Sequence, residues 1–216
     1  MNNINPKEDL ASIRDMMEKS SKFSNLSGIS IFFTGLLTII AASLIYFDLG
    51  FSYSDIEISY SQLIKNEGNQ EDLDKKIRLL IIFAGIVLTI SLLVLYVTAS
   101  RKTSKEGIVL FNPTFKRALK SLFIPILSGG IFSFFLIHHQ MYGLVAPATL
   151  IFYGLGLISA SKYSYDELEL LGFVELFLGV VSSYFMGEGL LFWVIGFGLA
   201  HIIFGLYLYF KFDKSK

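Results

Sequence analysis

The fold class follows first from Ser27–Phe47, which reads SGISIFFTGLLTIIAASLIYF and contains no charged residue. A helix of roughly 17–25 such residues crosses the roughly 30 Å hydrocarbon core of a bilayer. A cleaved signal peptide would not carry a leading segment of 26 residues with four acids. The stretch is therefore interpreted as a transmembrane helix.

Five further runs are apolar over a similar length: 79–99, 121–137, 144–160, 170–186 and 190–210. Their apolar character is continuous, whereas the strands of a membrane barrel alternate between apolar and polar residues. Only helices satisfy every backbone amide within a single span. The sequence therefore predicts an all-α, polytopic membrane helix bundle over 27–212, with six transmembrane helices arranged as three hairpins.

The composition agrees with a membrane protein. Of 216 residues, 53% are hydrophobic and 15% aromatic, and the mean hydropathy is +0.60. Only 17% are charged, against about 25% in a typical soluble domain. Eighteen basic residues balance eighteen acids, which gives no basic field for nucleic acid. The absence of cysteine excludes disulfides, thiolate metal sites and cysteine nucleophiles.

Basic residues predict the orientation. If the N-terminus is cytoplasmic, all of the 18 Lys and Arg residues fall on the inside except Lys65, Lys75, Lys76 and Arg78. Cytoplasmic loops carry an excess of Lys and Arg. The sequence therefore predicts that both termini lie in the cytoplasm.

Two polar segments flank the first span. Residues 1–26 are interpreted as a cytoplasmic amphipathic helix, either lying along the membrane surface or forming a solvated lead-in. Residues 48–76 form an acidic outer loop, which either concentrates cations or is an ordinary solvated loop.

Short motifs predict where some helices begin. Asn112-Pro113 is typical of an N-cap followed by proline at the first helical position. Ser164 and Glu167 have the spacing of a capping box, which places a helix start near Tyr165. Pro125 and Pro147 are expected to kink the spans that contain them.

Two spans share a pattern of glycine and phenylalanine. Gly28, Phe33 and Gly35 in the first span match Gly172, Phe177 and Gly179 in the fifth. A match of this kind suggests duplication of a helical hairpin.

Four segments carry a resemblance to known proteins: Met17–Ser21 with Leu26–Gly28, Ala146–Gly154, Ser159–Tyr163 and Gly196–His201. They resemble an uncharacterised family of small bacterial six-span membrane proteins and, more distantly, the HdeD-type acid-resistance membrane proteins. The resemblance implies the topology and a bacterial inner membrane. It implies no activity and no functional residue.

Motifs of soluble enzymes are missing. The sequence has no nucleotide-binding loop, no zinc-protease motif and no nucleophile elbow. The glycine pairs Gly154/Gly156 and Gly196/Gly198 lie within apolar spans, where glycine serves close helix packing. We therefore expect no enzymatic activity, no catalytic residue and no cofactor.

The most informative residues are Glu175 in the fifth span and His201 in the sixth. Each lies roughly 12–13 Å from the cytoplasmic end of its helix, at 1.5 Å per residue. Antiparallel neighbours would bring the two to one depth, and an intramembrane carboxylate needs a partner. Small residues accompany both, in the stripes Gly172/Gly179/Ser183 and Gly198/Gly205, which are expected to face each other. The pair is either a structural clamp between helices or a proton or ligand relay.

An outer-rim polar cluster is a weaker candidate. His138 and His139 end the third span, and Glu188 lies in the other short outer turn. Two imidazoles and a carboxylate can bind zinc. Adjacent histidines diverge from a helix, however, and no spacing fits a closed site, so no metal site is assigned.

Two classes of function remain open. The first is a non-catalytic accessory or stress-response membrane protein, acting through its cytoplasmic helix and the basic segment 100–120. That segment either docks an unknown protein partner or touches anionic lipid through Arg101, Lys102, Lys105, Lys116 and Arg117. The second is a small transporter or permeation protein that uses a Glu175–His201 relay.

Overall fold

The computed structural model describes residues 27–48, 70–105, 107 and 111–214. The long elements in these ranges are helices, and none of the described residues lies in a strand. The predicted all-α fold class is therefore confirmed for this part of the chain. The expected helix over 1–26 and most of the acidic loop over 48–76 lie outside the described residues.

The described residues contain five continuous α-helices: α2 Gly28–Asp48, α4 Gln70–Lys105, α5 Pro113–His138, α6 Val145–Ser161 and α7 Glu167–Tyr184. Short 3₁₀ turns, η1 Tyr142–Leu144 and η2 Met186–Glu188, precede α6 and follow α7. The last rod, here called the final helix, joins α8 Gly189–Trp193, η3 Val194–Ala200, α9 His201–Leu208 and η4 Tyr209–Asp213. Its segments η3 and η4 are π-helical.

Five helices among the described residues are long and apolar enough to cross a membrane: Gly28–Phe47, Arg78–Lys105, Pro113–His138, Tyr142–Ser161 and Gly189–Asp213. The remaining long helix, α7, has 18 residues and is not among them. It carries three glutamates, Glu167, Glu169 and Glu175. The apolar helices indicate a multi-pass membrane protein.

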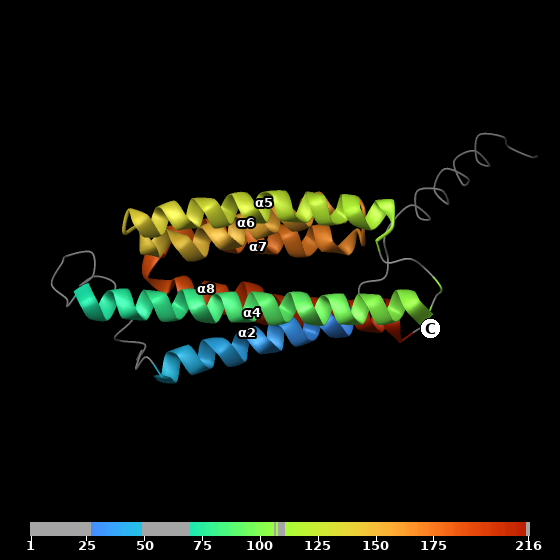
Figure 1. Ribbon diagram of the computed structural model, residues 1–216, viewed down its shortest axis with the longest axis horizontal. Coiled ribbons are helices and arrows are strands. Elements are labelled where there is room, and N and C mark those ends of the chain that lie inside the picture. The colour runs from blue at the N-terminus through green and yellow to red at the C-terminus, as the bar shows by residue number, and fades with distance from the viewer. Residues whose placement is uncertain (1–26, 49–69, 106, 108–110, 215–216) are drawn as a thin grey trace, which may run out of the picture.

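The helices form two groups (Figure 1). In one group α6 packs between α5 and α7, and in the other α2 packs against both α4 and the final helix. The most extensive contacts join α6 to α7 and α2 to the final helix. A buried cluster joins the two groups: Ile31, Leu157, Tyr165, Leu168, Leu171, Phe204 and Leu208.

Glycines set the closest helix approaches. A Cβ on Gly154 of α6 would lie 2.6 Å from the carbonyl oxygen of Gly172 on α7. A Cβ on Gly205 of the final helix would lie 2.8 Å from the carbonyl oxygen of Gly28 on α2. Backbones that meet this closely exclude any side chain. The matched glycines of the predicted repeat, Gly28 and Gly172, thus each lie at the closest contact of their own helix pair.

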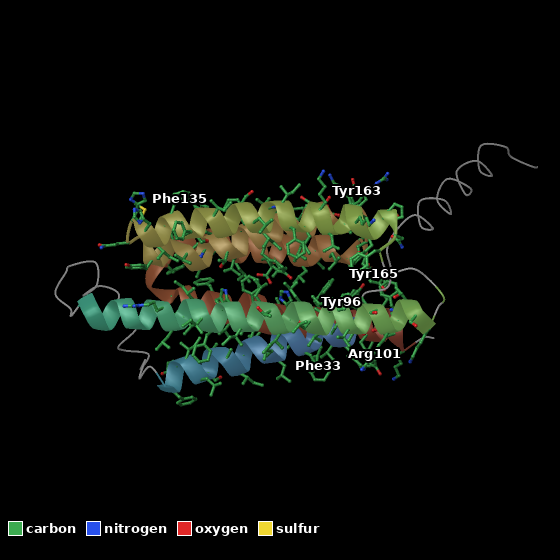
Figure 2. All side chains as sticks on the ribbon, in the orientation of Figure 1. Phe33, Tyr96, Arg101, Phe135, Tyr163 and Tyr165 are labelled. Carbon is green, nitrogen blue, oxygen red and sulfur yellow. The ribbon has the colours of Figure 1, made fainter. Side chains whose placement is uncertain are left out.

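Figure 2 shows the two ends of the bundle. Arg101, Tyr163 and Tyr165 lie toward one end, and Phe135 lies toward the other. The first is here called the basic end, because the α4 residues Arg101, Lys102 and Lys105 and the α5 residues Lys116 and Arg117 lie there. The other is called the rim.

The helix starts follow the sequence in part. Asn112 caps α5, because its side-chain oxygen accepts a hydrogen bond from the Phe115 N–H at 2.8 Å. The helix expected to start near Tyr165 begins at Glu167, after Asp166. A turn precedes it, in which the Leu168 N–H donates to the Tyr165 carbonyl at 3.1 Å.

The two prolines differ. Pro125 lies inside α5, as predicted. Pro147 lies in the first turn of α6, which begins at Val145. A proline there removes an N–H that has no partner within the helix, so the expected kink in this span has no cause.

Candidate functional site

Glu175 lies on the buried face of α7 and is 0% exposed. Its Oε2 contacts Gly196 of the final helix where a side chain at that position would begin. Leu150 of α6 closes the same space, with its Cδ2 2.7 Å from where a Cβ of residue 196 would stand. The carboxylate therefore fits only because residue 196 is a glycine.

His201 begins α9 directly after the π-helical segment η3 and is 3% exposed. Its Nδ1 lies 3.0 Å from the carbonyl oxygen of Gly196, five residues earlier. A carbonyl oxygen can only accept, so Nδ1 carries the hydrogen of this bond. The π-helical turn, in which residues five apart are partners, places the two groups together.

Tyr153 of α6 completes the arrangement. Its hydroxyl lies 2.8 Å from His201 Nε2, and the two rings are stacked with centroids 5.5 Å apart. Because Nδ1 carries a hydrogen, neutral His201 accepts the Tyr153 O–H at Nε2. Phe197 covers both rings, at centroid distances of 5.0 Å from Tyr153 and 5.9 Å from His201. We refer to Tyr153, Glu175, Gly196 and His201 as the central site.

The structure brings Glu175 and His201 together, with Oε1 and Nδ1 3.3 Å apart. This is an ion-pair distance, but the Nδ1 hydrogen is directed at the Gly196 carbonyl. Among the described residues, neither oxygen of Glu175 has a hydrogen-bond partner. Most buried polar side chains do have one, so this carboxylate is an exception that requires an explanation.

The predicted facing of the small-residue stripes is wrong. Gly172 and Gly179 of α7 contact α6, where a Cβ on Gly179 would lie 2.9 Å from the Ile151 nitrogen. Gly198 and Gly205 of the final helix contact α2, where a Cβ on Gly198 would lie 2.8 Å from Ile39 Cγ1. Each stripe serves a different helix pair, because the closest approaches are α6 with α7 and α2 with the final helix.

Sequence reasoning missed two members of the central site. Gly196 was assigned only to helix packing, since nothing in an apolar run predicts a π-helical turn. Tyr153 lies in the apolar run 144–160, which contains no charged residue. The depth argument that pairs Glu175 with His201 would also have found it, because its hydroxyl is one of the few polar groups in the middle of α6.

The outer-rim residues do not form a comparable site. His138 and His139 are exposed, and their rings meet edge to face at 5.2 Å. In the described part of the chain, no three His, Asp or Glu side chains are grouped to hold a metal ion. His138, His139 and Glu188 are thus not brought together as a ligand set.

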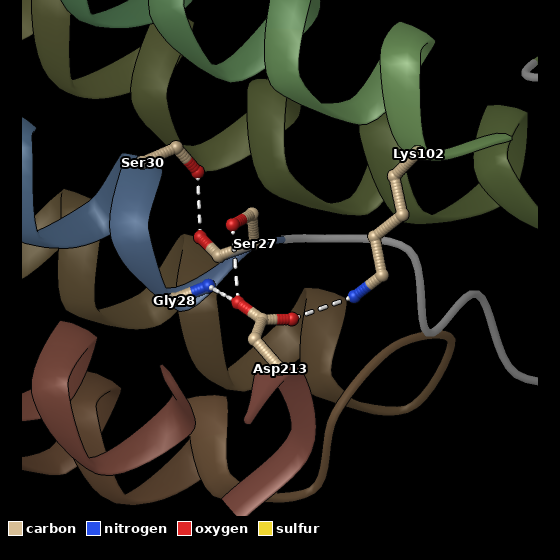
Figure 3. A network of polar contacts seen from close by, with 5 residues as sticks. All are labelled: Ser27, Gly28, Ser30, Lys102 and Asp213. Atoms are coloured by element: carbon tan, nitrogen blue, oxygen red, sulfur yellow. Dashed lines mark hydrogen bonds and ion pairs between the residues drawn. The ribbon is translucent and has the colours of Figure 1, made fainter. Parts of the chain in front are cut away.

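A polar network lies at the basic end (Figure 3). Asp213 Oδ2 accepts hydrogen bonds from the Gly28 N–H at 2.8 Å and the Ser27 hydroxyl at 3.1 Å. Its Oδ1 accepts from Lys102 Nζ at 2.9 Å. Asp213 therefore joins the start of α2 to the ends of α4 and the final helix.

The five residues assigned to anionic lipid do not share one environment. Arg101, Lys105, Lys116 and Arg117 are exposed. Lys102 differs, because its side chain is 18% exposed and its ammonium is bonded to Asp213. This lysine contributes to the protein's own network.

Comparison of the chain with protein-family models, curated proteins and solved structures found no match. The resemblance drawn from the sequence therefore stays a hypothesis, and the central site and the basic end are the features that bear on function.

Proposed function

We propose that this chain is a six-span protein of the bacterial inner membrane, with both ends of the described region on the cytoplasmic side. Five helices in the described part of the chain are apolar enough to span a bilayer, and α7 packs between them with its single mid-helix charge turned inward. A charge buried against neighbouring helices is the usual way in which a span tolerates a carboxylate.

The orientation is supported by the basic end. Exposed Arg101, Lys105, Lys116 and Arg117 lie there together with Lys214. Basic residues gather on the cytoplasmic side and are attracted to anionic headgroups at about 1 kcal/mol each. We therefore propose anionic lipid as the partner of the four exposed α4 and α5 residues.

We propose a non-catalytic, accessory role in the membrane, with stress response as its most specific form. One observation carries this proposal: Glu175 and His201 are 0% and 3% exposed, so the central site is closed to a substrate in solution. Its side chains come from α6, α7 and the final helix, and the site thereby ties the two helix groups together.

Cysteine labelling tests topology and closure in one experiment, because the chain has no native cysteine. A water-soluble thiol reagent added to intact cells should label His139→Cys from outside but not Lys214→Cys. The same reagent should fail to label Leu150→Cys in open membranes, since Leu150 is 0% exposed. Outside labelling at 214 would contradict the topology, and rapid labelling at 150 would contradict the closed site.

A second candidate is a small transporter with a proton relay, and the geometry of the carboxylate favours it. An imidazole bonded at both ring nitrogens lies between a tyrosine hydroxyl and a carboxylate without a hydrogen-bond donor. This order of groups suits proton transfer along the line Tyr153, His201, Glu175. Reconstituted protein should then show pH-dependent flux that Glu175→Gln abolishes while the fold is kept.

A further inference from the structure

Among the described residues, the helix segments around the central site carry no other titratable side chain. Glu175 and His201 are the only acid and the only imidazole within the six apolar runs of the sequence. On α2, which packs against the other side of η3, residues 28–45 have no titratable side chain. Residues 189–200, before His201, have none either, and between 145 and 161 α6 offers only Tyr153. The charge of the site is therefore set by its own three titratable groups.

Burial of the central site favours a total charge of zero. A carboxylate beside a neutral imidazole would leave one negative charge in a site that is 0% exposed. A carboxylic acid beside an imidazolium would leave one positive charge. An isolated buried charge is strongly unfavourable, whereas a buried group that neutralises or pairs avoids most of this cost. The neutral state holds one proton more than the carboxylate–imidazole pair.

That proton has two places. In the first it lies on His201 Nε2, and the imidazolium donates both to Tyr153 and toward Gly196 and Glu175. In the second, Nδ1 has given its hydrogen to Glu175 Oε1 across 3.3 Å, and His201 keeps its other hydrogen on Nε2, which donates to the Tyr153 oxygen. No carboxylate hydrogen bond has to break, because neither oxygen has one.

We propose that Glu175, His201 and Tyr153 form a binding site for a single proton, and that Tyr153 is the group through which the proton enters. Tyr153 is half-buried, whereas the other two side chains are sealed, so of the three residues it is the most exposed. The absence of donors at Glu175 is then explained, since the carboxylate is the alternative place for the bound proton. This proposal goes beyond the accessory role and does not require transport.

Nitrogen NMR of protein labelled at histidine, in detergent micelles, tests the proposal. The chain has three histidines, and the exposed pair His138 and His139 are references within the same molecule. Imidazole is the side chain whose ordinary pKa lies nearest neutral pH, so the spectrum is recorded between about pH 5 and 8. The His201 signal should stay in place over this range, because the site keeps one proton.

Two variants separate the members of the site. Glu175→Gln removes the compensating charge, so His201 should become a neutral imidazole with its hydrogen on Nδ1 at every pH. Tyr153→Phe should leave the charge state unchanged but slow solvent exchange of the His201 ring hydrogen several-fold. Phe197→Leu is the matched control for lost aromatic packing and should not slow that exchange.

The result that overturns the proposal needs no variant. If the wild-type His201 signal moves over this pH range, the site does not keep a single proton. An unchanged His201 spectrum in folded Glu175→Gln would also overturn it. Cysteine labelling decides the topology separately, so the two proposals fail independently.

Discussion

Two carboxylates join distant helices in this protein, and their surroundings are opposite. Asp213 lies at the basic end, is 14% exposed and accepts three hydrogen bonds, from Gly28, Ser27 and Lys102. Glu175 lies in the middle of the bundle, is 0% exposed and accepts none, although His201 lies 3.3 Å away. The more deeply buried carboxylate is thus the one with fewer donors.

This difference separates a structural role from a chemical one. Asp213 shows how the chain holds a carboxylate for stability: a helix N-terminus, a hydroxyl and an ammonium satisfy it. A clamp at Glu175 would require the same donors, because burial makes missing hydrogen bonds more costly. Glu175 lacks these donors, in keeping with the proton exchange with His201 that we propose.

The largest expected effect is at the basic end, where the contact is between backbones. Gly28→Ala would place a Cβ against the Tyr209 nitrogen and 2.6 Å from the Gly205 carbonyl oxygen, so α2 and the final helix must separate. We expect a loss of about 3 kcal/mol or more, at the upper end for over-packing. Unfolding in mixed detergent micelles, followed by circular dichroism, measures it.

Gly130→Ala is the matched control, because nothing lies within 4 Å of the added Cβ. Alanine is favoured over glycine within a helix by about 0.5–1 kcal/mol, so this variant should be slightly more stable. Equal losses in the two variants would contradict the close α2 contact.

The next effect concerns the satisfied carboxylate. Asp213→Ala leaves the Gly28 N–H, the Ser27 hydroxyl and Lys102 without their acceptor, and we expect a loss of about 1–3 kcal/mol. Glu169→Ala, at an exposed glutamate in the first turn of α7, should change stability by less than about 0.5 kcal/mol. The same unfolding assay compares them, and similar values would show that the network is not stabilising.

A smaller effect on stability is expected to distinguish Lys102 from Lys105, which both lie on α4. Lys102→Gln should cost about 1 kcal/mol, because the ion pair with Asp213 is only partly shielded from water. Lys105→Gln should leave stability unchanged and instead weaken binding to vesicles that contain anionic lipid. Vesicle flotation with each folded variant measures the lipid binding. An equal loss of stability in both variants would contradict the different roles of the two lysines.

The smallest effect is expected at the unsatisfied carboxylate. Glu175→Gln removes no hydrogen bond, so the free energy of unfolding should change by less than about 1 kcal/mol. A loss above about 2 kcal/mol would mean that the pair with His201 holds the helices together, and the contrast with Asp213 would then fail.

The sequence predicts the helices well, because a continuous apolar run has one way to satisfy its backbone. It also predicts the cap at Asn112, whose signal is local. Which helices pack together depends on residues far apart in the sequence. Gly28 and Gly205 are in contact although most of the chain lies between them, and no spacing within either run predicts this contact. For the same reason, the sequence predicts that the small-residue stripes beside Glu175 and His201 face each other, whereas each stripe contacts a different helix.

The central site could be predicted only as far as depth allows. Depth follows from counting residues, so Glu175 and His201 could be matched. The rotation of His201 about its helix follows from the π-helical turn at 194–200, which depends on packing around Gly196. Whether the carboxylate oxygens of Glu175 have a hydrogen-bond donor follows from that rotation, so the sequence alone could not predict it.

The pairing of α2 with the final helix also sets the order in which the protein can be completed during synthesis. Chains emerge at about 5–20 residues per second, so Asp213 follows Gly28 by roughly 10 seconds or more. Over that interval α2 has neither its contact with Gly205 nor its hydrogen bonds to Asp213. Helices α5, α6 and α7 are neighbours along the chain and can assemble as they emerge. The group α5, α6 and α7 is thus expected to form first. Helix α2, although synthesised before them, is expected to be among the last to complete its packing.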